Sequence, residues 1–441
     1  MSIIIYLLTS ILACGNKETT AEPSSDDTAE VEDTADVEEA SFLTEAFSCT
    51  PDLDGSGVAS GSDLMKVTLN SENALCNDGS PAVMFVRRAA TVADEQNWVF
   101  HLQGGGGCGG SDCEKRWCER NEKMTSVRAP EGMLEKGILT RGPQNELGNA
   151  NQVYVYYCSS DNWAGTQQNV EVDAVDEIPA FRIHFNGKGI LEEVFSVLEA
   201  GAVSDGGEET LPPLVGGGWA LWTGTSGGCQ GVMNTADRTA EYLRSLGVSP
   251  WIVCDANYSP TTLDLPAGEA LDTYVAQRKL RFEINQQYAQ PAFDQSCLDA
   301  HPEEEEYLCD WTGYGLRNHI VEAPLFVRMS LADNTISKAY IDAGFTMEEF
   351  ALGVRSLMLR SSSEDGNEAP ERPIAVYGPG CTQHVGLTDN EWFFETLIYV
   401  NENPVSFHDA VVAWMGGMDV AVVDTVPPTN SVCGEATDDT D

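Results

Sequence analysis

Short apolar runs alternate with longer amphipathic segments along most of the chain. The short runs are rich in Val, Ile and aromatic residues, as buried strands are, whereas the longer segments repeat apolar residues every three or four positions, as helices do. Strands are predicted at Val67–Leu69, Val83–Val86, Trp98–Leu102, Val153–Tyr157, Trp219–Trp222, Trp251–Cys254, Pro324–Arg328 and Ile374–Tyr377. Helices are predicted at Ile190–Leu198, Gly231–Leu246, Leu271–Tyr288, Ile336–Leu359 and Glu391–Val400. This alternation is typical of α/β proteins in which helices cover both faces of a mainly parallel sheet.

The clearest chemical signal lies where the run Trp219–Trp222 meets a helical pattern. Gly224, Ser226 and Gly228 form the pattern G-x-S-x-G at this junction. In a turn between a strand and a helix, such a serine exposes its Oγ at the edge of the sheet, and the following N–H, here that of Gly227, can face a developing oxyanion. The simpler alternative is a surface serine in an ordinary turn, because a chain with 41 glycines contains this pattern easily by chance.

A nucleophilic serine in such a turn needs a carboxylate and then a histidine further along the chain. His384 follows the last predicted strand in a loop, and we favour it as the base over His408, which lies near a possible helix start. Asp333 follows the apolar run Pro324–Met329, where it can orient the histidine or, alternatively, cap the next helix. The predicted catalytic residues are therefore Ser226, Asp333 and His384.

A glycine-rich loop, Gln103–Gly110, follows the predicted strand Trp98–Leu102. Residues without side chains let the backbone approach a tetrahedral intermediate closely, so Gly105 and Gly106 are predicted to donate their N–H groups to the oxyanion together with Gly227. A phosphate-binding loop is the alternative, but no Gly-Lys-Ser/Thr sequence follows the glycines. The cysteine within the loop argues against a flexible linker.

Several segments resemble the pectin acetylesterase and Notum family of carboxylesterases. Cys76–Ala82 reads CNDGSPA, Tyr157–Gly165 reads YCSSDNWAG and Asp237–Leu243 reads DRTAEYL, each close to a family motif. The loop Leu102–Cys108 and the element His184–Gly187 add to this resemblance. The resemblance implies an α/β-hydrolase-like fold, with a mostly parallel sheet, helices on both faces and loop insertions. It also implies a serine hydrolase of carboxylic esters that works through an acyl-enzyme and requires no cofactor or metal.

By the same resemblance, the expected substrate is an O-acylated, and in particular an acetylated, polysaccharide or a similar extracellular ester. A Notum-like deacylase of longer fatty-acyl esters and a non-catalytic surface binding protein on a hydrolase scaffold are the alternatives. Three departures from the family pattern bear on this choice. Gly227–Cys229 stand where Ala-Gly-Gly is usual, Gly106 and Gly107 replace a bulky aromatic residue, and Gln103 replaces a glutamate.

The cysteine content indicates an exported protein. The chain has 13 cysteines, and their spacing does not resemble that of paired zinc ligands. Cys14 ends a short apolar segment that looks like a bacterial lipobox, so we expect it to be lipidated. Removing it leaves 12 cysteines, an even number compatible with disulfides formed in an oxidising compartment. Cys297 and Cys309 form a plausible pair, but spacing alone does not give the connectivity.

The segment from Lys17 to Ala40 is acidic and almost free of large apolar residues, so it cannot bury enough surface to fold. The predicted organisation is therefore a lipoprotein-type signal peptide with its lipobox (1–14), an acidic tether (15–44), one catalytic domain (45–433) and an acidic tail (434–441). The segments 115–149 and 289–318 are expected to form cap or rim loops, where Trp311 can shape a pocket. The anchor would place the protein in the bacterial cell envelope, at the outer membrane or cell surface.

The net charge of −46 disfavours anionic partners, whereas a calcium ion is still possible. Nucleic acid and anionic membranes repel such a chain, so contact with a membrane is expected only through the lipid anchor. Unesterified polyanions are also disfavoured, unless basic residues lie near the cleft. Asp52–Asp63 has the spacing of a calcium-binding loop, although its last carboxylate is Asp rather than Glu and a strand follows; a polar turn is the alternative.

Overall fold

A ten-stranded mixed sheet lies at the centre of the computed structural model, which describes residues 40–49, 58–362, 373–426 and 431–433. In order across the sheet, its strands are β15 (Ala421–Val423), β12 (Ala375–Gly378), β11 (Leu325–Arg328), β10 (Ser249–Asp255), β9 (Trp219–Thr225), β4 (Trp98–Leu102), β6 (Asn151–Val155), β3 (Val83–Arg87), β2 (Ser60–Thr68) and β5 (Gly132–Met133). Neighbours from β15 to β6 are parallel, and those from β6 to β5 are antiparallel. Every residue of β3, β4, β6, β11 and β12 is buried, and because successive side chains point to opposite faces, both faces of the sheet are covered.

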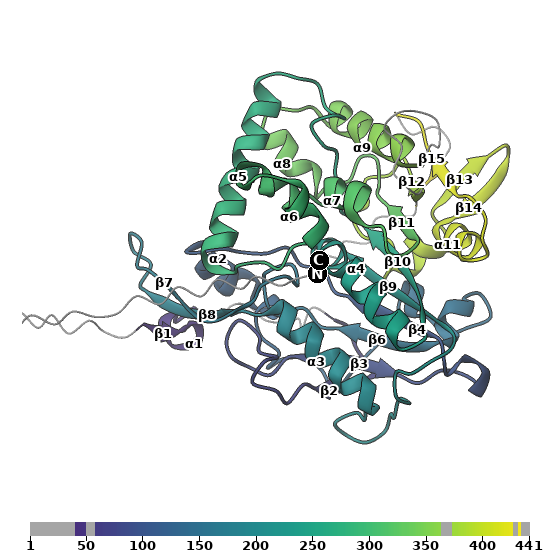
Figure 1. Ribbon diagram of the computed structural model, residues 1–441, viewed down its shortest axis with the longest axis horizontal. Helices are drawn as coiled ribbons and strands as arrows, with labels where there is room; N and C mark the ends of the chain where they lie inside the picture. The colour runs from purple at the N-terminus through teal and green to yellow at the C-terminus, as the bar shows by residue number, and fades with distance from the viewer. Residues whose placement is uncertain (1–39, 50–57, 363–372, 427–430, 434–441) are drawn as a thin grey trace, which may run out of the picture. The chain divides into compact units, whose positions relative to one another are not determined.

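Helices surround this sheet; some pack directly on its strands, and others pack on a small sheet or on one another. The helices of the described residues are α1 (Leu43–Ala46), α2 (Asp112–Arg120), α3 (Gly187–Ala200), α4 (Gly227–Ser245), α5 (Glu269–Tyr288), α6 (Gln295–Ala300), α7 (Thr312–His319), α8 (Ser337–Asp342), α9 (Met347–Ser362), α10 (Asn390–Phe394) and α11 (Phe407–Met415). Short 3-10 turns occur at η1 (Val92–Asp94), η2 (Asn121–Lys123), η3 (Gly137–Leu139), η4 (Glu146–Asn149) and η5 (Glu303–Asp310). Helices α3 and α4 run side by side in front of the central strands (Figure 1).

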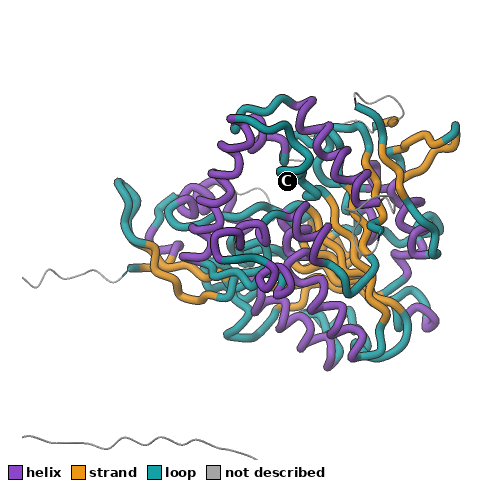
Figure 2. Tube along the Cα trace, turned by 45° about the horizontal axis from the view of Figure 1, so that its top comes forward, coloured by secondary structure: helices purple, strands orange, loops and turns teal. Residues whose placement is uncertain are grey.

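Two small sheets flank the main one. One joins β1 (Ser41–Phe42), β8 (Phe181–Phe185) and β7 (Gln167–Val172), and the other joins β14 (Asn403–Ser406), β13 (Leu397–Val400) and β16 (Ser431–Val432). They lie on opposite sides of the main sheet (Figure 1 and Figure 2). The sequence pattern missed both: β7 and β14 are short and partly exposed, and the apolar run of β13 was assigned to a helix.

All of the predicted strands lie within or overlap strands of the main sheet, whereas two predicted helices differ from the structure. The segment Ile336–Leu359 contains two helices, α8 and α9, separated at Gly344, whose φ of +111° is incompatible with a helix. The prediction of a helix over Glu391–Val400 is wrong beyond Phe394, since residues 397–400 form β13. Asn401 and Glu402 have φ angles of +49° and +67°, which fit the two-residue turn of the hairpin between β13 and β14.

Disulfides link all cysteines of the described chain. The pairs are Cys49–Cys118, Cys76–Cys158, Cys108–Cys113, Cys229–Cys254, Cys297–Cys309 and Cys381–Cys433. The predicted disulfide framework and the predicted Cys297–Cys309 pair are therefore confirmed. Cys14, the remaining cysteine, lies outside the described residues.

The folded unit begins at Ala40, earlier than the predicted boundary at 45. Ser41 and Phe42 pair with β8, and the Leu43 side chain is fully buried. The last part of the predicted tether therefore belongs to the folded unit, and Leu43 packs in a small hydrophobic core. The signal peptide, the rest of the tether, the acidic tail and the first half of the proposed calcium loop lie outside the described residues. Asp63, the last residue of that loop, accepts a hydrogen bond from the Glu135 N–H at 3.1 Å. Among the helices that the structure describes, none has the length and apolar content needed to cross a membrane.

The burial of Leu43 gives a test of this boundary. Leu43→Ala should reduce the free energy of unfolding by about 2 kcal/mol, because it removes apolar contacts with the small core that α1 forms with β8. Leu263→Ala, at a position that is 71% exposed, is the matched control and should leave stability unchanged. Thermal unfolding of both variants measures the difference, and equal melting temperatures would place the start of the fold after Leu43.

Candidate active site

Ser226 occupies a strained turn between β9 and α4. Its φ and ψ angles are 53° and −117°, an unusual conformation for a residue with a side chain. Its N–H donates to the Asp255 carbonyl at 2.9 Å, which fixes the turn against β10. A Cβ at Gly228 would overlap the Leu102 carbonyl oxygen, so glycine is needed here for α4 to approach β4. The disulfide between Cys229 and Cys254 then joins the first turn of α4 to β10.

His384 and Asp333 lie in hydrogen-bond contact in loops at the ends of β12 and β11. The His384 Nδ1 and the Asp333 Oδ2 are 2.8 Å apart, and the Asp333 side chain is fully buried. The other carboxylate oxygen accepts the N–H groups of Thr335 and Ile336 at 2.9 and 2.8 Å. Asp333 thus both caps the following segment and contacts the histidine, so the two readings of this residue from sequence are compatible.

The second nitrogen of His384 is available for chemistry. The Nε2 atom is buried and has no hydrogen-bond partner among the described residues, and His384 lines the same cavity as Ser226. Burial alone would lower the pKa of His384, but the charge and the hydrogen bond of Asp333 together raise it above the ordinary value of 6.5. His408 does not line this cavity; its Nε2 lies 3.4 Å from Glu146 in an ion-pair arrangement.

Arg328 and Asp255 anchor the His384 loop, and sequence reasoning missed both. Arg328 is 1% exposed and Asp255 is fully buried, with 3.0 Å between Arg328 Nη1 and Asp255 Oδ1. Arg328 Nη1 also donates to the His384 carbonyl at 2.5 Å, and Asp255 Oδ2 accepts the N–H groups of Gly386 and Leu387, both at 2.7 Å. The ion pair therefore holds the loop at the histidine and at the residues that follow it. The sequence feature that could have indicated them is a charged residue at the end of each of two apolar strands, β10 and β11.

The glycine-rich loop lies against the Ser226 turn. A Cβ on Gly227 would be 3.1 Å from the Gly106 nitrogen, so the N–H groups of these two residues are close neighbours. Gly105 and Gly106 have φ angles of +148° and +64°, which glycine adopts readily. Gln103 fixes the base of the loop, because its Oε1 accepts the Tyr157 N–H at 2.9 Å.

Neighbouring segments hold the rest of this loop. The Trp163 Nε1 donates to the Gln103 carbonyl at 3.1 Å, and the Cys108 N–H donates to the Ser160 carbonyl at 3.0 Å. The disulfide Cys108–Cys113 adds a covalent link. Asn162, which the sequence analysis quoted only as part of a motif, lines the cavity beside Gly227. These contacts fix the loop beside the Ser226 turn.

The cavity has a volume of about 310 Å³ and a mainly polar lining. Ser226, Gly227, Gly105, Gly106 and His384 line it together. Its basic lining residues are Arg120, Lys123, Arg278 and Arg281, and its other polar residues include Gln230, Asn257, Ser259, Asp310 and Thr312. The predicted rim segments supply several of these residues, whereas the arginines of α5 were not anticipated. Trp311 is buried, and the Cζ atom of the Arg278 guanidinium lies 4.8 Å from the centroid of its ring.

Comparisons with known proteins identify the family of this chain. Residues 59–434 match the family model described as Pectinacetylesterase. The palmitoleoyl-protein carboxylesterase NOTUM of Drosophila melanogaster is 28% identical over 378 residues, which cover 82% of this chain and 49% of that protein. The protein of the same name from Homo sapiens is 26% identical over 348 residues, 75% of this chain and 62% of that protein. The chain thus spans about half of the first relative and less than two thirds of the second.

Solved structures show the same fold. The crystal structure of the Wnt deacylase Notum from Drosophila has a TM-score of 0.61 and 24% identity, and the match covers 80% of this chain and 93% of that chain. A second crystal form gives a TM-score of 0.60 at 25% identity. The predicted α/β-hydrolase fold, with its mostly parallel sheet, is therefore confirmed.

The anchoring of the His384 loop predicts a specific effect of Arg328→Lys. Lysine keeps the buried positive charge but cannot form the same fork of hydrogen bonds, so the loop should lose its fixed position while the chain still folds. We expect kcat to fall roughly tenfold with KM nearly unchanged. Arg244→Lys, in an exposed ion pair with Glu322, is the matched control. Steady-state ester hydrolysis measures both; a change in KM alone would contradict a role in positioning His384.

The raised pKa of His384 predicts the pH dependence. Only the neutral imidazole can accept a proton, so kcat/KM should fall as the pH drops through a midpoint above 6.5. Asp333→Asn removes the charge that raises the pKa, so the midpoint should move down and the rate should drop by roughly 10³-fold or more. A pH profile of p-nitrophenyl acetate hydrolysis tests both statements. A native midpoint below 6.5 would show that Asp333 does not control this histidine.

Proposed function

Because the chain belongs to the pectinacetylesterase family, we propose that it is a serine carboxylesterase that removes O-linked acetyl groups from a polysaccharide or a similar extracellular ester. The observation that carries the proposal is the convergence of Ser226 and His384 on one cavity, with Asp333 bound to His384 at 2.8 Å. This combination supplies a nucleophile, a base and a carboxylate that orients the base.

In the proposed reaction, His384 Nε2 accepts the proton of the Ser226 hydroxyl while Oγ attacks the ester carbonyl. Asp333 keeps the proton of the imidazole on Nδ1 and stabilises the imidazolium that forms. The N–H groups of Gly105, Gly106 and Gly227 bind the oxyanion of the tetrahedral intermediate. His384 then returns its proton to the leaving alcohol, which gives an acyl-enzyme. Water, deprotonated by the same histidine, releases the acid and restores the serine.

The polarity of the cavity supports a small acyl group on a polar alcohol. Arg120, Arg278 and Arg281 line it, and polar surface exceeds the apolar surface that residues such as Tyr274 and Ile336 provide. A long fatty-acyl chain needs a deep apolar pocket, because burying charged groups against hydrocarbon is costly. Gly106 replaces the aromatic residue usual in the family, and a Cβ there would have no neighbour within 4 Å. The space beside Gly106 is therefore open, which suits a leaving alcohol larger than a methyl group.

The basic lining residues also bear on the charge of the substrate. Although the whole chain has a net charge of −46, these arginines place positive charge in the cavity that Ser226 lines. They would offset the repulsion that the acidic surface exerts on an acidic sugar. An acetylated polysaccharide, including one that carries carboxylates, is therefore compatible with this cavity.

The proposed location follows from the cysteines. Six disulfides indicate an oxidising compartment outside the cytosol. We propose in addition that Cys14 carries a lipid anchor and that an acidic tether links it to the domain in a bacterial cell envelope. Metabolic labelling with a radioactive fatty acid tests this anchor, with Cys14→Ser as the unlabelled control.

Hydrolysis of p-nitrophenyl acetate and p-nitrophenyl octanoate tests the proposed function. The acetate should be the better substrate by kcat/KM, and Ser226→Ala should reduce its turnover at least roughly 10³-fold. A preference for octanoate would favour the Notum-like alternative, in which longer acyl esters are cleaved. If the wild-type chain shows no turnover beyond that of Ser226→Ala, the result would favour a non-catalytic binding protein.

A further inference from the structure

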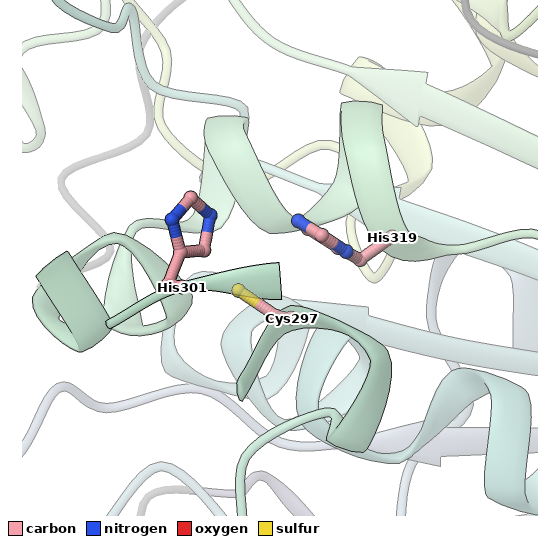
Figure 3. A group of neighbouring side chains, drawn as sticks. All are labelled: Cys297, His301 and His319. Carbon is pink, nitrogen blue, oxygen red and sulfur yellow. The ribbon is translucent and has the colours of Figure 1, made fainter. Parts of the chain in front are cut away.

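A cluster of one cysteine and two histidines lies outside the catalytic cavity. Cys297 is on α6, His301 follows the end of α6, and His319 is the last residue of α7. Their potential ligand atoms all lie within 4.8 Å of one another. The two imidazoles and the sulfur converge on one point, as Figure 3 shows. Among the residues that the structure describes, these three form a group of ligand-bearing side chains close enough for small movements to bring them around a metal ion.

The contacts around His319 fit a metal ligand. Its Nδ1 lies 3.2 Å from the Ser296 hydroxyl, which fixes the ring, while its Nε2 is buried and has no hydrogen-bond partner. A histidine that binds a metal through one nitrogen commonly has the other held in this way. The Ser296 hydroxyl in turn donates to Asp294 at 2.6 Å.

The surroundings of His301 favour a cation. His301 Nε2 lies 2.8 Å from the Tyr314 hydroxyl, and its Nδ1 lies 3.4 Å from Glu305. His301 and His319 stand at the C-terminal ends of α6 and α7, where the helix dipoles add negative potential. Binding a metal requires His301 to exchange one of its two contacts for the ion.

Cys297 is committed to a disulfide with Cys309 and in that form offers no thiolate. We propose that Cys297, His301 and His319 form a site for Zn²⁺ or a similar divalent transition metal, which opens when an external dithiol reduces the Cys297–Cys309 disulfide. In that exchange the dithiol is oxidised to its disulfide, and Cys297 and Cys309 become thiols. The metal then displaces the proton of the Cys297 thiol, and one sulfur and two nitrogens are ligands typical of zinc.

The site lies beside the catalytic rim but does not depend on the proposed esterase activity. Asp310 directly follows Cys309, lines the cavity, and its carbonyl accepts the Arg278 guanidinium at 2.6 Å. Ligand atoms of tetrahedral zinc, which lie at about 2.0–2.3 Å from the metal, are closer to one another than 4.8 Å. The three side chains must therefore draw together, and release of Cys297 from Cys309 permits that movement.

Cys309→Ser tests the site without a reductant, because it frees the Cys297 thiol and leaves the other disulfides oxidised. Calorimetric titration should show one Zn²⁺ bound per chain, and Co²⁺ should give a thiolate charge-transfer band in the near ultraviolet. Addition of His319→Ala should weaken binding by more than about tenfold. The matched control is Cys297→Ser/Cys309→Ser, which lacks the same disulfide but has no thiol. Equal zinc binding by this control and by Cys309→Ser would overturn the proposal.

A second measurement uses the wild-type chain and keeps the proposal testable if Cys309→Ser does not fold. Partial reduction with a phosphine, which is oxidised to its phosphine oxide, is followed by alkylation and peptide mapping. Zn²⁺ should slow alkylation of Cys297 severalfold in the wild type and not in His319→Ala. Cys433, exposed in its pair with Cys381, is an internal control that zinc should not affect. Alkylation of Cys297 at the same rate with and without zinc would rule the site out.

Discussion

The register of four adjacent parallel strands is the constraint on which the site depends. Asp255 at the end of β10 is level with Thr225 of β9 and with Arg328 of β11, and Arg328 is level with Tyr377 of β12. Because parallel strands point the same way, the segments that leave them emerge along one edge of the sheet. Ser226 and the loops that carry Asp333 and His384 therefore start from neighbouring positions, although they are distant in the sequence.

The buried pair of Arg328 and Asp255 converts this closeness into a defined geometry. Burying two charges is costly, and the cost is offset only when their hydrogen-bonding groups are satisfied. Here Asp255 accepts two N–H groups of the His384 loop, and Arg328 donates to the His384 carbonyl and to Ser330. The pair thus fixes the path of the His384 loop. The register of the strands alone fixes only where this loop begins. Buried polar networks of this kind favour one arrangement of a loop over its alternatives.

Local patterns predicted the central strands, the Ser226 turn, the glycine-rich loop and the positions of Asp333 and His384, since each depends on a few consecutive residues. They did not predict the pairing of Arg328 with Asp255, because that contact joins strands that are distant in sequence. The hairpin of β13 and β14 was missed for another reason. Its apolar residues also fit the period of a helix, and its turn has no glycine that would indicate a hairpin. The basic side chains of α5 were not predicted to line the cavity, because their place there depends on how this helix packs and not on a local sequence pattern.

Covalent labelling is the most direct test of a serine that is activated by a distant histidine. A fluorophosphonate reacts with a serine hydroxyl only when a neighbouring base removes its proton, and peptide mass spectrometry locates the adduct. The convergence of these strands predicts a single adduct on Ser226 that disappears in His384→Ala while the variant remains folded. An adduct on another residue, or equal labelling of Ser226 in that variant, would contradict the central claim.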